Sequence, residues 1–388
     1  MMKAWTINRA NPNSENIRLP SESLVMRTVP IPEIKNSNEV LVKLKSSSLN
    51  FNTVWSCMRQ PMDPFTLLAG HIKRNPYDNH HNLDYYIPGS DGSGSVVDVG
   101  DGVLDFKPGD DVVIHCAVIS DEDTHLKDSM LSKSQSIWGY ETNYGAFAEY
   151  TLIKSSQLIK KPESLDFLTA GSCLLTLGTA YRMLISENGA QIKKGETCLI
   201  WGASGGLGVF AIQLCLAIGA IPVCIVSDED KAKYCKDIGA NKVIICDRKD
   251  QEDLVDKNGK ANYLRWRKFE KKLMECLGNN RVDCVFEHIG RNVFSMSIFL
   301  LRRGGRLVTC AATTGYEAII DIRYVWMEMK RIIGSHFCTS AEAKEALDML
   351  LHGQIKHKYD TAIAFDEIPK GLDSLYLRNS RGKIVVQY

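Results

Sequence analysis

The stretch Leu199-Ile-Trp-Gly-Ala-Ser-Gly-Gly-Leu-Gly208 decides the fold. An apolar run from Thr197 to Trp201 leads into three glycines spaced as G-x-x-G-x-x-G, and a helical pattern continues to Ala220. Glycines let a backbone approach a pyrophosphate, and a helix N-terminus directs free N–H groups at its charge. The apolar run Ile221–Val226 supplies the next strand of a βαβ unit. We therefore interpret the stretch as a dinucleotide site, with a plain tight turn as the alternative.

Composition excludes several classes of protein. The 388 residues suggest roughly two domains. With 44% hydrophobic and 24% charged residues the chain can bury a core and stay soluble, and a net charge of +1 favours neither nucleic acid nor an anionic membrane. No apolar run reaches the ~18 residues of a membrane span, and the first residues lack the apolar core of a signal peptide. The twelve scattered cysteines, with no C-x-x-C, indicate reduced thiols, so we expect a cytoplasmic protein.

Short strand patterns separated by glycine turns fill the N-terminal part and predict a small β-rich, barrel-like domain. These patterns are Glu39–Leu49, Ile87–Gly100, Phe106–His115 and Ile137–Tyr150. Two segments interrupt them: Pro61–Tyr86 indicates a surface loop or short helices, and the polar stretch Cys116–Gln135 indicates an inserted loop.

Beyond Ser164 strands and helices alternate, which predicts a parallel α/β domain. The expected helices are Leu168–Ser186, Val209–Ala220, Lys231–Ile238 and Ser295–Leu301, and the expected strands are Thr197–Trp201, Pro222–Val226, Lys242–Ile245, Asp283–Glu287 and Arg306–Cys310. The segments Arg331–Phe337 and Thr361–Tyr388 are strand-rich, and we expect them to rejoin the N-terminal part. We therefore place a Rossmann domain at residues 161–313 and the β-rich domain at residues 1–160 and 314–388.

The stretch Asp256–Lys272 is strongly basic, with seven lysines and arginines. A solvated helix face is the favoured interpretation, and a patch for ligand phosphates is the alternative.

The residues after the second Rossmann strand indicate which nicotinamide cofactor binds. An acidic residue there binds the ribose 2′-hydroxyl of NAD and repels the 2′-phosphate of NADP. Here Ser227 follows the strand, and Lys231 comes four residues later. A hydroxyl with a nearby ammonium suits a phosphate. Asp228 and Glu229 weaken this case, although acidic groups in a first helical turn are also ordinary dipole partners. We favour NADPH.

The segment Gly89-Ser-Asp-Gly-Ser-Gly94 resembles the strand and turn of the medium-chain dehydrogenase/reductase superfamily. Its zinc alcohol dehydrogenases have Gly-His-Glu where this chain has Gly89-Ser90-Asp91, and a cysteine ligand where it has Asn50. Their structural lobe with four cysteines is absent here. Serine and asparagine do not replace imidazole and thiolate as zinc ligands. We therefore expect no metal, and hydride transfer to an activated C=C bond.

Longer strings resemble the crotonyl-CoA carboxylase/reductase family, from about Val40 to the C-terminus. They are Asn50-Phe-Asn-Thr-Val-Trp55, Ile137-Trp-Gly-Tyr-Glu-Thr-Asn143, Ile200–Gly208, Val285-Phe-Glu-His288, Arg323-Tyr324 with Trp326, and Lys330-Arg-Ile-Ile-Gly-Ser-His-Phe337. The resemblance implies a Rossmann domain beside a GroES-like catalytic domain, in a homotetramer built from dimers. It also implies NADPH-dependent reductive carboxylation: hydride adds to the β-carbon of a 2-enoyl-CoA, and the enolate captures carbon dioxide without biotin, giving an alkylmalonyl-CoA.

The resemblance also assigns site residues. The carbon dioxide pocket falls on Asn52, Tyr140, Glu141 and His336. An Asn52 N–H and the backbone beside Tyr140 and Glu141 would bind the two oxygens of carbon dioxide, and Glu141 with His336 would hold a water. Arg323 and Tyr324 would bind CoA. The cofactor set is Gly202, Ala203, Ser204, Gly205, Gly206, Leu207, Gly208, Ser227, Lys231, Arg248 and His288.

For several of these residues, a purely structural role stays open as the alternative. Asn52 would then be a turn residue that satisfies its own backbone, Glu141 a surface carboxylate, His336 a satisfied core histidine, and Arg323 with Tyr324 a surface pair.

Two positions depart from the family pattern, which has Phe at the place of Tyr140 and a second Gly at the place of Ala146. The phenol adds a polar group, and a potential proton donor, beside the carbon dioxide site. Protonation of the enolate would give simple reduction. A non-carboxylating enoyl-thioester reductase is therefore one alternative. A zinc-free quinone or enone reductase of the same superfamily and a non-catalytic NADPH-binding protein are two others.

Overall fold

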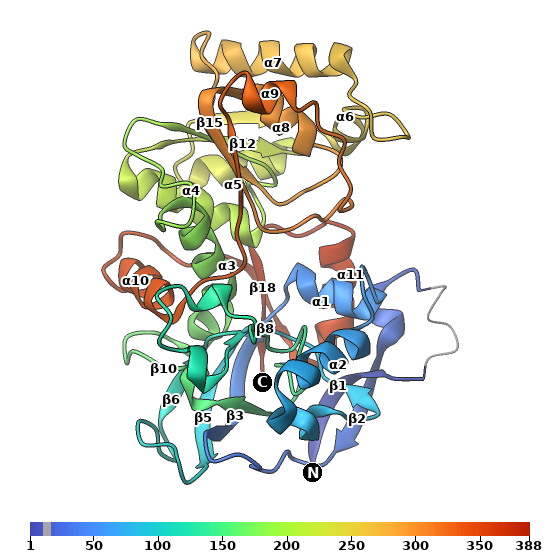
Figure 1. Cartoon of the computed structure of the whole chain (residues 1–388), viewed down its shortest axis with the longest axis vertical. Helices are drawn as coiled ribbons and strands as arrows, with labels where there is room; N and C mark the ends of the chain where they lie inside the picture. The colour runs from blue at the N-terminus through green and yellow to red at the C-terminus, as the bar shows by residue number, and fades with distance from the viewer. Residues whose placement is uncertain (11–16) are drawn as a thin grey trace. The chain divides into compact units, whose positions relative to one another are not determined.

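In the computed structural model, which describes residues 1–10 and 17–388, the chain forms two units (Figure 1). The first unit comprises Met1–Leu175, Thr339–Ala343 and Tyr359–Tyr388. The second comprises Thr176–Cys338 and Lys344–Lys358. Within the described residues, no helix has both the length and the apolar character that crossing a membrane requires.

The second unit is built on a six-stranded parallel sheet. Its strands, in spatial order, are β13 (Lys242–Ile245), β12 (Ile221–Val226), β11 (Thr197–Ile200), β14 (Val282–Glu287), β15 (Leu301–Thr309) and β16 (Arg331–Gly334). Nearly all residues of β11, β12 and β14 are buried, which explains their continuous apolar runs, because helices cover both faces of such a sheet. The predicted parallel α/β architecture is thus observed.

The helices of this region include those expected from the sequence and others, over Arg323–Trp326 and Ser340–Leu351, that were not predicted. They are α3 (Phe167–Leu184, shared between the units), α4 (Gly206–Ile218), α5 (Glu229–Asp237), α6 (Arg248–Glu252), α7 (Tyr263–Leu277), α8 (Phe294–Leu300), α9 (Arg323–Trp326) and α10 (Ser340–Leu351). Helix α7 buries Trp266, Phe269 and Leu273 against the core and leaves Arg267, Lys268, Lys271 and Lys272 exposed. This arrangement favours the solvated-face interpretation of the basic stretch.

The boundary of the second unit lies later in the chain than we expected. Strand β16 pairs in parallel with β15, from Arg306 opposite Arg331 to Thr309 opposite Gly334, so this segment belongs to the Rossmann sheet. The expectation that everything beyond residue 313 rejoins the β-rich part is therefore corrected: the second unit continues to Cys338. Four residues of strand pattern do not indicate which of two sheets will take them.

The first unit is β-rich, as predicted. Its largest sheet runs β10 (Leu158–Lys160), β6 (Asp111–Ile114), β5 (Gly92–Val99), β3 (Glu39–Ser48), β18 (Lys383–Gln387) and β17 (Tyr359–Ala364), and β9 (Tyr150–Lys154) also pairs with β3. Smaller sheets join β2 (Leu24–Val29), β1 (Met2–Asn8) and β4 (Tyr85–Tyr86), and join β7 (Ala117–Val118) with β8 (Ser136–Ile137). The helices that the structure describes in this unit include α1 (Phe51–Met58), α2 (Pro64–Arg74) and α11 (Ile368–Tyr376).

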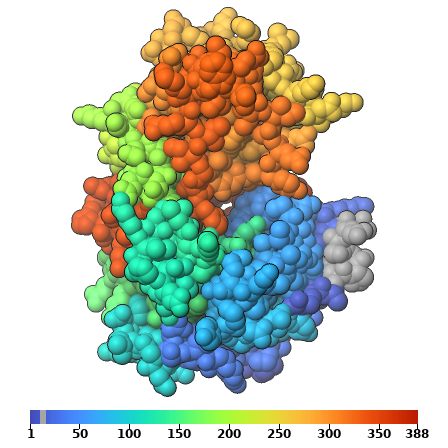
Figure 2. Space-filling model, in the orientation of Figure 1, coloured from blue at the N-terminus to red at the C-terminus, as the bar shows by residue number. Residues whose placement is uncertain are grey.

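Two segments of the first unit differ in character. The polar insertion after Cys116 carries β7 and two short 3-10 turns, and it forms a surface region drawn in teal in Figure 2. The strand expected over Ile137–Tyr150 is mostly absent, since β8 ends at Ile137 and turns follow. The Ile137 carbonyl accepts the N–H groups of Tyr140, Glu141 and Thr142, which curls the chain there.

Candidate active site

The glycine stretch forms the turn between β11 and α4. Gly202 has a φ of 57°, which disfavours other residues, and a Cβ on it would lie 3.0 Å from the His288 ring. Gly205 is the N-cap of α4, and a Cβ there would meet only the Gly202 oxygen, at 3.4 Å. A Cβ on Gly208 would come within 2.6 Å of the Ala203 backbone. The turn thus packs tightly against its own helix and leaves room at the helix N-terminus, where a pyrophosphate fits.

A hydroxyl and an ammonium meet after β12. Lys231 Nζ donates to Ser227 Oγ at 2.9 Å and lies 3.1 Å from Asp228 Oδ2. Asp228 caps α5 by accepting the Lys231 N–H at 2.9 Å. Burial alone would raise the pKa of Asp228, but the hydrogen bonds from Lys231 and Ser227 hold it below its usual value. The acid is therefore occupied with its helix, and the Ser227–Lys231 pair suits a 2′-phosphate.

The two remaining cofactor candidates also lie in the second unit. His288 Nε2 lies 2.9 Å from the Trp201 carbonyl, so this nitrogen carries the proton and the ring stays beside the glycine turn. Arg248 begins α6, just after β13, and is exposed. Both residues therefore follow carboxyl ends of the parallel strands, where open α/β sheets bind ligands.

Asn52 is held in the first turn of α1. Its Oδ1 accepts the N–H of Thr53 at 2.9 Å, and its Nδ2 donates to Ser90 Oγ at 2.8 Å. The side chain is half-buried. Asn52 therefore bonds to the backbone of its own turn, as the structural alternative predicted. Its amide has a second N–H besides the one donated to Ser90.

Backbone contacts bring the segment of Tyr140 beside the residues that hold Asn52. The Gly89 N–H donates to the Gly139 carbonyl at 3.2 Å, and a Cβ on Gly139 would lie 1.9 Å from the Gly89 oxygen. Only glycine at position 139 permits this approach. Because Ser90 follows Gly89 and Tyr140 follows Gly139, the first unit places Asn52, Ser90 and Tyr140 in one neighbourhood.

Tyr140 and Glu141 occupy a partly desolvated place. Burial raises the pKa of Glu141, against the hydrogen bond that its carboxylate accepts from Ile137 N at 2.8 Å. Burial also raises the pKa of Tyr140, and the neighbouring charge of Glu141 adds to that shift. The phenol is thus protonated at neutral pH. The backbone N–H groups of both residues turn to the Ile137 carbonyl, so a carbon dioxide oxygen would have to share one of them.

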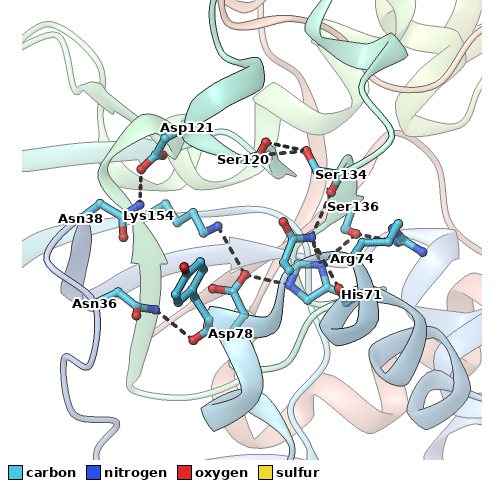
Figure 3. A network of polar contacts seen from close by, with 12 residues as sticks. Asn36, Asn38, His71, Arg74, Asp78, Ser120, Asp121, Ser134, Ser136 and Lys154 are labelled. Atoms are coloured by element: carbon cyan, nitrogen blue, oxygen red, sulfur yellow. Dashed lines mark hydrogen bonds and ion pairs between the residues drawn. The ribbon is translucent and has the colours of Figure 1, made fainter.

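A buried polar network anchors the strand that precedes this turn (Figure 3). His71 of α2 bridges Asp78 and Ser136, with Nε2 at 2.9 Å from Asp78 Oδ2 and Nδ1 at 2.9 Å from Ser136 Oγ. Lys154 Nζ lies 3.3 Å from the same Asp78 oxygen. Burial alone would raise the pKa of Asp78, but His71 and Lys154 hold it well below its usual value. The network therefore fixes β8, from which Tyr140 and Glu141 follow.

The positions that zinc ligands occupy in related dehydrogenases hold a buried ion pair here. Lys383 Nζ lies 2.6 Å from Asn50 Oδ1 and 3.2 Å from Asp91 Oδ2, and Ser48 Oγ donates to the same Asp91 oxygen at 2.8 Å. Lys383 is 3% exposed and Asp91 is 1% exposed. An amide, a hydroxyl and a carboxylate already paired with an ammonium do not fit zinc.

The other predicted residues lie in the second unit. His336 follows β16 and is exposed. Surrounding protein atoms and the charge of Arg182 lower its pKa, so the ring is neutral at neutral pH. Arg323 is exposed and paired with Asp321 at 2.7 Å, and the Tyr324 ring packs on Phe299 with centroids 5.4 Å apart.

Sequence reasoning missed Ser90 and Lys383 as parts of this site. Ser90 entered only as a residue that cannot bind zinc, and the lysine was not singled out. Lys383 stands directly before the apolar run Ile384-Val-Val386, which indicates that it lies in a buried strand. Because a lysine is rarely buried without a charged partner, this position could have predicted a buried ion pair.

Comparisons with known proteins follow the same division. Residues 36–163 match the family model described as alcohol dehydrogenase GroES-like domain, and residues 206–352 match the one described as zinc-binding dehydrogenase. The fold class expected from the sequence, a GroES-like domain with a Rossmann domain, is confirmed.

Individual relatives match over almost the whole chain. A crotonyl-CoA reductase of Streptomyces collinus is 40% identical over 95% of this chain and 82% of its own length. A crotonyl-CoA carboxylase/reductase of Cereibacter sphaeroides is 37% identical over 97% of this chain and 84% of its own. The solved structure of the 2-octenoyl-CoA carboxylase reductase CinF, in complex with NADP and 2-octenoyl-CoA, has a TM-score of 0.92 at 36% identity, over 100% of this chain and 87% of that one.

Proposed function

The chain belongs to the crotonyl-CoA carboxylase/reductase family, and on that premise we propose that it converts a 2-enoyl-CoA to an alkylmalonyl-CoA by NADPH-dependent reductive carboxylation. The observation that carries this assignment is the Asn52–Ser90 pair beside Tyr140, in a place where the neighbouring Asn50 and Asp91 are occupied by Lys383. An amide donor there suits a neutral gas with two acceptor oxygens.

The second unit holds the cofactor in this proposal. The turn Gly202–Gly208 takes the pyrophosphate, the Ser227–Lys231 pair takes the 2′-phosphate, and Arg248 and His288 complete the set. NADPH, when bound, supplies the hydride for the β-carbon of the thioester. The relative CinF, whose solved structure contains NADP, supports the choice of cofactor.

The first unit handles the enolate. The free N–H of Asn52 binds an oxygen of carbon dioxide and stabilises the charge that grows there as the α-carbon attacks. The partly desolvated Glu141 holds a water at the edge of the pocket and keeps loose solvent from the carbanion. For His336, Arg323 and Tyr324 the assignment to carbon dioxide and to CoA rests on the resemblance.

A second candidate, simple reduction of the enoyl thioester, is favoured by Tyr140. Its phenol keeps its proton at neutral pH, and Tyr140 follows Gly139, which bonds to Gly89 next to the Ser90 partner of Asn52. A proton delivered to the α-carbon would end the reaction as a saturated acyl-CoA. The two candidates share hydride transfer and differ only in what reaches the enolate.

Product identification separates them. The purified chain is incubated with crotonyl-CoA and NADPH, once with bicarbonate and carbonic anhydrase and once after removal of carbon dioxide. The thioester products are then identified by mass spectrometry. Ethylmalonyl-CoA in the first incubation supports carboxylation. Butyryl-CoA in both supports simple reduction, and turnover of small enones in place of either thioester would contradict both.

We also propose that the chain works as a homo-oligomer joined through the second unit. Strand β16 ends the sheet order among the described residues, and exposed large apolar side chains gather in the segment around it. These are Tyr316, Ile319, Ile322, Trp326, Met327, Met329 and Ile332. Light scattering should give a multiple of the 43.4 kDa chain mass, reduced to one chain by Trp326→Asp. A single-chain mass for the parent would contradict this.

A further inference from the structure

Three metal-binding side chains converge in the first unit, outside the residues assigned to carbon dioxide. Glu39 begins β3, and His80 and His81 end the 3-10 helix η3 (Pro76–His81). One potential ligand atom of each residue lies within 4.8 Å of the others. Zn²⁺ bonds to nitrogen and oxygen ligands of about 2.0–2.2 Å place such atoms about 3.4 Å apart in a tetrahedral site, so small side-chain rotations are enough.

The His80 ring is oriented as a metal ligand would be. Its Nδ1 lies 3.2 Å from the Tyr77 carbonyl, so this nitrogen carries a proton. Its Nε2 lies 2.7 Å from Glu39 Oε1. A histidine that donates one N–H to a backbone carbonyl and directs its other nitrogen at a shared point is the usual arrangement around zinc. A lone pair facing a carboxylate needs a cation between them, either a proton or a metal ion.

His81 supplies an independent observation. It is 8% exposed, and its Nδ1 is buried without a hydrogen-bond partner among the residues that the structure describes. A buried nitrogen left unpartnered is unfavourable, and a metal ion would satisfy it.

The surroundings hold the three residues in place. Glu39 Oε2 accepts the N–H groups of Lys35 and Asn36 at 2.7 and 2.8 Å, and its Oε1 accepts from Asn36 Nδ2 at 3.0 Å. Asn36 Nδ2 also donates to the Tyr77 carbonyl of η3 at 3.3 Å, and Asp78 of the same helix is held by His71 and Lys154 (Figure 3). The helix that carries both histidines is thus anchored on each side, as a preorganised metal site requires.

We propose that Glu39, His80 and His81 bind one Zn²⁺ ion, with a water as the fourth ligand. Imidazole and carboxylate ligands suit zinc, and three protein ligands leave one position open. The ion would join η3 to β3. The His81 ring packs on Tyr144, with centroids 4.9 Å apart, and the His81 carbonyl accepts from Asn143 Nδ2 at 3.1 Å. Zinc here would therefore stiffen the segment that carries Tyr140 and Glu141, and it takes no part in hydride transfer.

The test uses the full-length chain without an affinity tag, stripped with a chelator and dialysed. The stripped chain is dialysed against a trace concentration of zinc, and the number of zinc ions retained per chain is counted. The affinity for zinc is measured by competition with a chromophoric indicator. Co²⁺ then serves as a spectroscopic probe, because its visible absorption reports four-coordinate binding. The key variant is His80→Arg, since arginine pairs with Glu39 and does not bind metal. His125→Gln, which removes an exposed histidine of the same unit, is the control.

The proposal expects one zinc per parent chain and per His125→Gln chain. His80→Arg should bind at least about 10- to 100-fold more weakly, the loss typical for even an outer partner of a metal site. The cobalt bands should disappear with it, and zinc should raise the melting temperature of the parent but not of His80→Arg. The proposal is overturned if His80→Arg retains as much zinc as the parent, or if the parent loses its zinc on dialysis. Equal weakening of zinc binding in His125→Gln would also overturn it, because that result would mean an adventitious ion only.

Discussion

Replacement of Asn52 by leucine tests the carbon dioxide pocket at the group that should matter most. The substitution keeps the size of the side chain and removes its amide. In the structure one N–H of that amide donates to Ser90 at 2.8 Å, which leaves the second for a ligand. Hydride transfer to the β-carbon does not use this N–H, whereas attack on carbon dioxide places charge on the oxygen it would contact.

The size of the effect follows from that geometry. A hydrogen bond to a charged group is worth about 1.5–3 kcal/mol, and each 1.4 kcal/mol corresponds to about ten-fold in rate. Asn52→Leu should therefore lower the ratio of carboxylated to reduced product by about 10- to 100-fold, with a much smaller loss of total NADPH oxidation. Ser90→Ala removes the anchor and keeps the amide, so its effect should stay within the range of one neutral hydrogen bond, about 2- to 10-fold.

Two measurements on the same reaction decide the outcome. NADPH oxidation gives the total rate by absorbance, and mass spectrometry with isotopically labelled bicarbonate gives the two products. If Asn52→Leu lowered oxidation and carboxylation by the same factor, Asn52 would be a structural residue of α1, and the pocket would have to be placed elsewhere.

Four further predictions, on five substitutions, follow from the same structure. Tyr140→Phe removes a protonated phenol beside the pocket, so the carboxylated share of product should rise, and an unchanged share would show that the phenol is no proton donor. Gly205→Ala should weaken NADPH binding about ten-fold or more in titrations without lowering the melting temperature of the protein. Gly208→Ala should lower the melting temperature, because its new Cβ meets backbone at 2.6 Å. Equal losses of melting temperature in the two variants would contradict this. Lys231→Glu should lower kcat/KM for NADPH about ten-fold or more relative to NADH, since it places a carboxylate in the pair that we propose binds the 2′-phosphate. An unchanged ratio would contradict that assignment. Glu141→Gln should stabilise the fold at neutral pH, because folding raises the pKa of Glu141 and its ionisation is therefore destabilising. The gain should be absent in acid below the ordinary carboxyl pKa of about 4.3. Urea unfolding midpoints at both pH values would show whether the gain in stability has this pH dependence.

The Rossmann unit was predictable because its signals are local. The strand, the three glycines and the helix between Thr197 and Ala220 stand in one continuous stretch, and β11 and α4 follow it closely. Buried parallel strands also announce themselves as apolar runs. Strand β16 was misplaced because its four residues pair in a register set by β15, which the segment itself does not encode.

The candidate site was predictable only by resemblance to a family. Its geometry depends on contacts between distant parts of the chain: Asn52 with Ser90, Gly139 with Gly89, and Lys383 with Asn50. No periodicity in the sequence reports such contacts. The turn after Ile137 also looked like a strand. Hydrogen bonds from the N–H groups that follow to the Ile137 carbonyl curl it, and its Gly139 lies against Gly89 of a distant segment, and neither contact shows as a periodicity.

In reductive carboxylation, hydride and carbon dioxide enter one product molecule, at neighbouring carbons. The direct measurement supplies NADPH deuterated at the transferred position together with isotopically labelled bicarbonate, and locates both labels in the product by mass spectrometry. We expect an alkylmalonyl-CoA with deuterium at the β-carbon and the labelled carboxyl group on the α-carbon. A saturated acyl-CoA that carries deuterium alone, under saturating carbon dioxide, would contradict it.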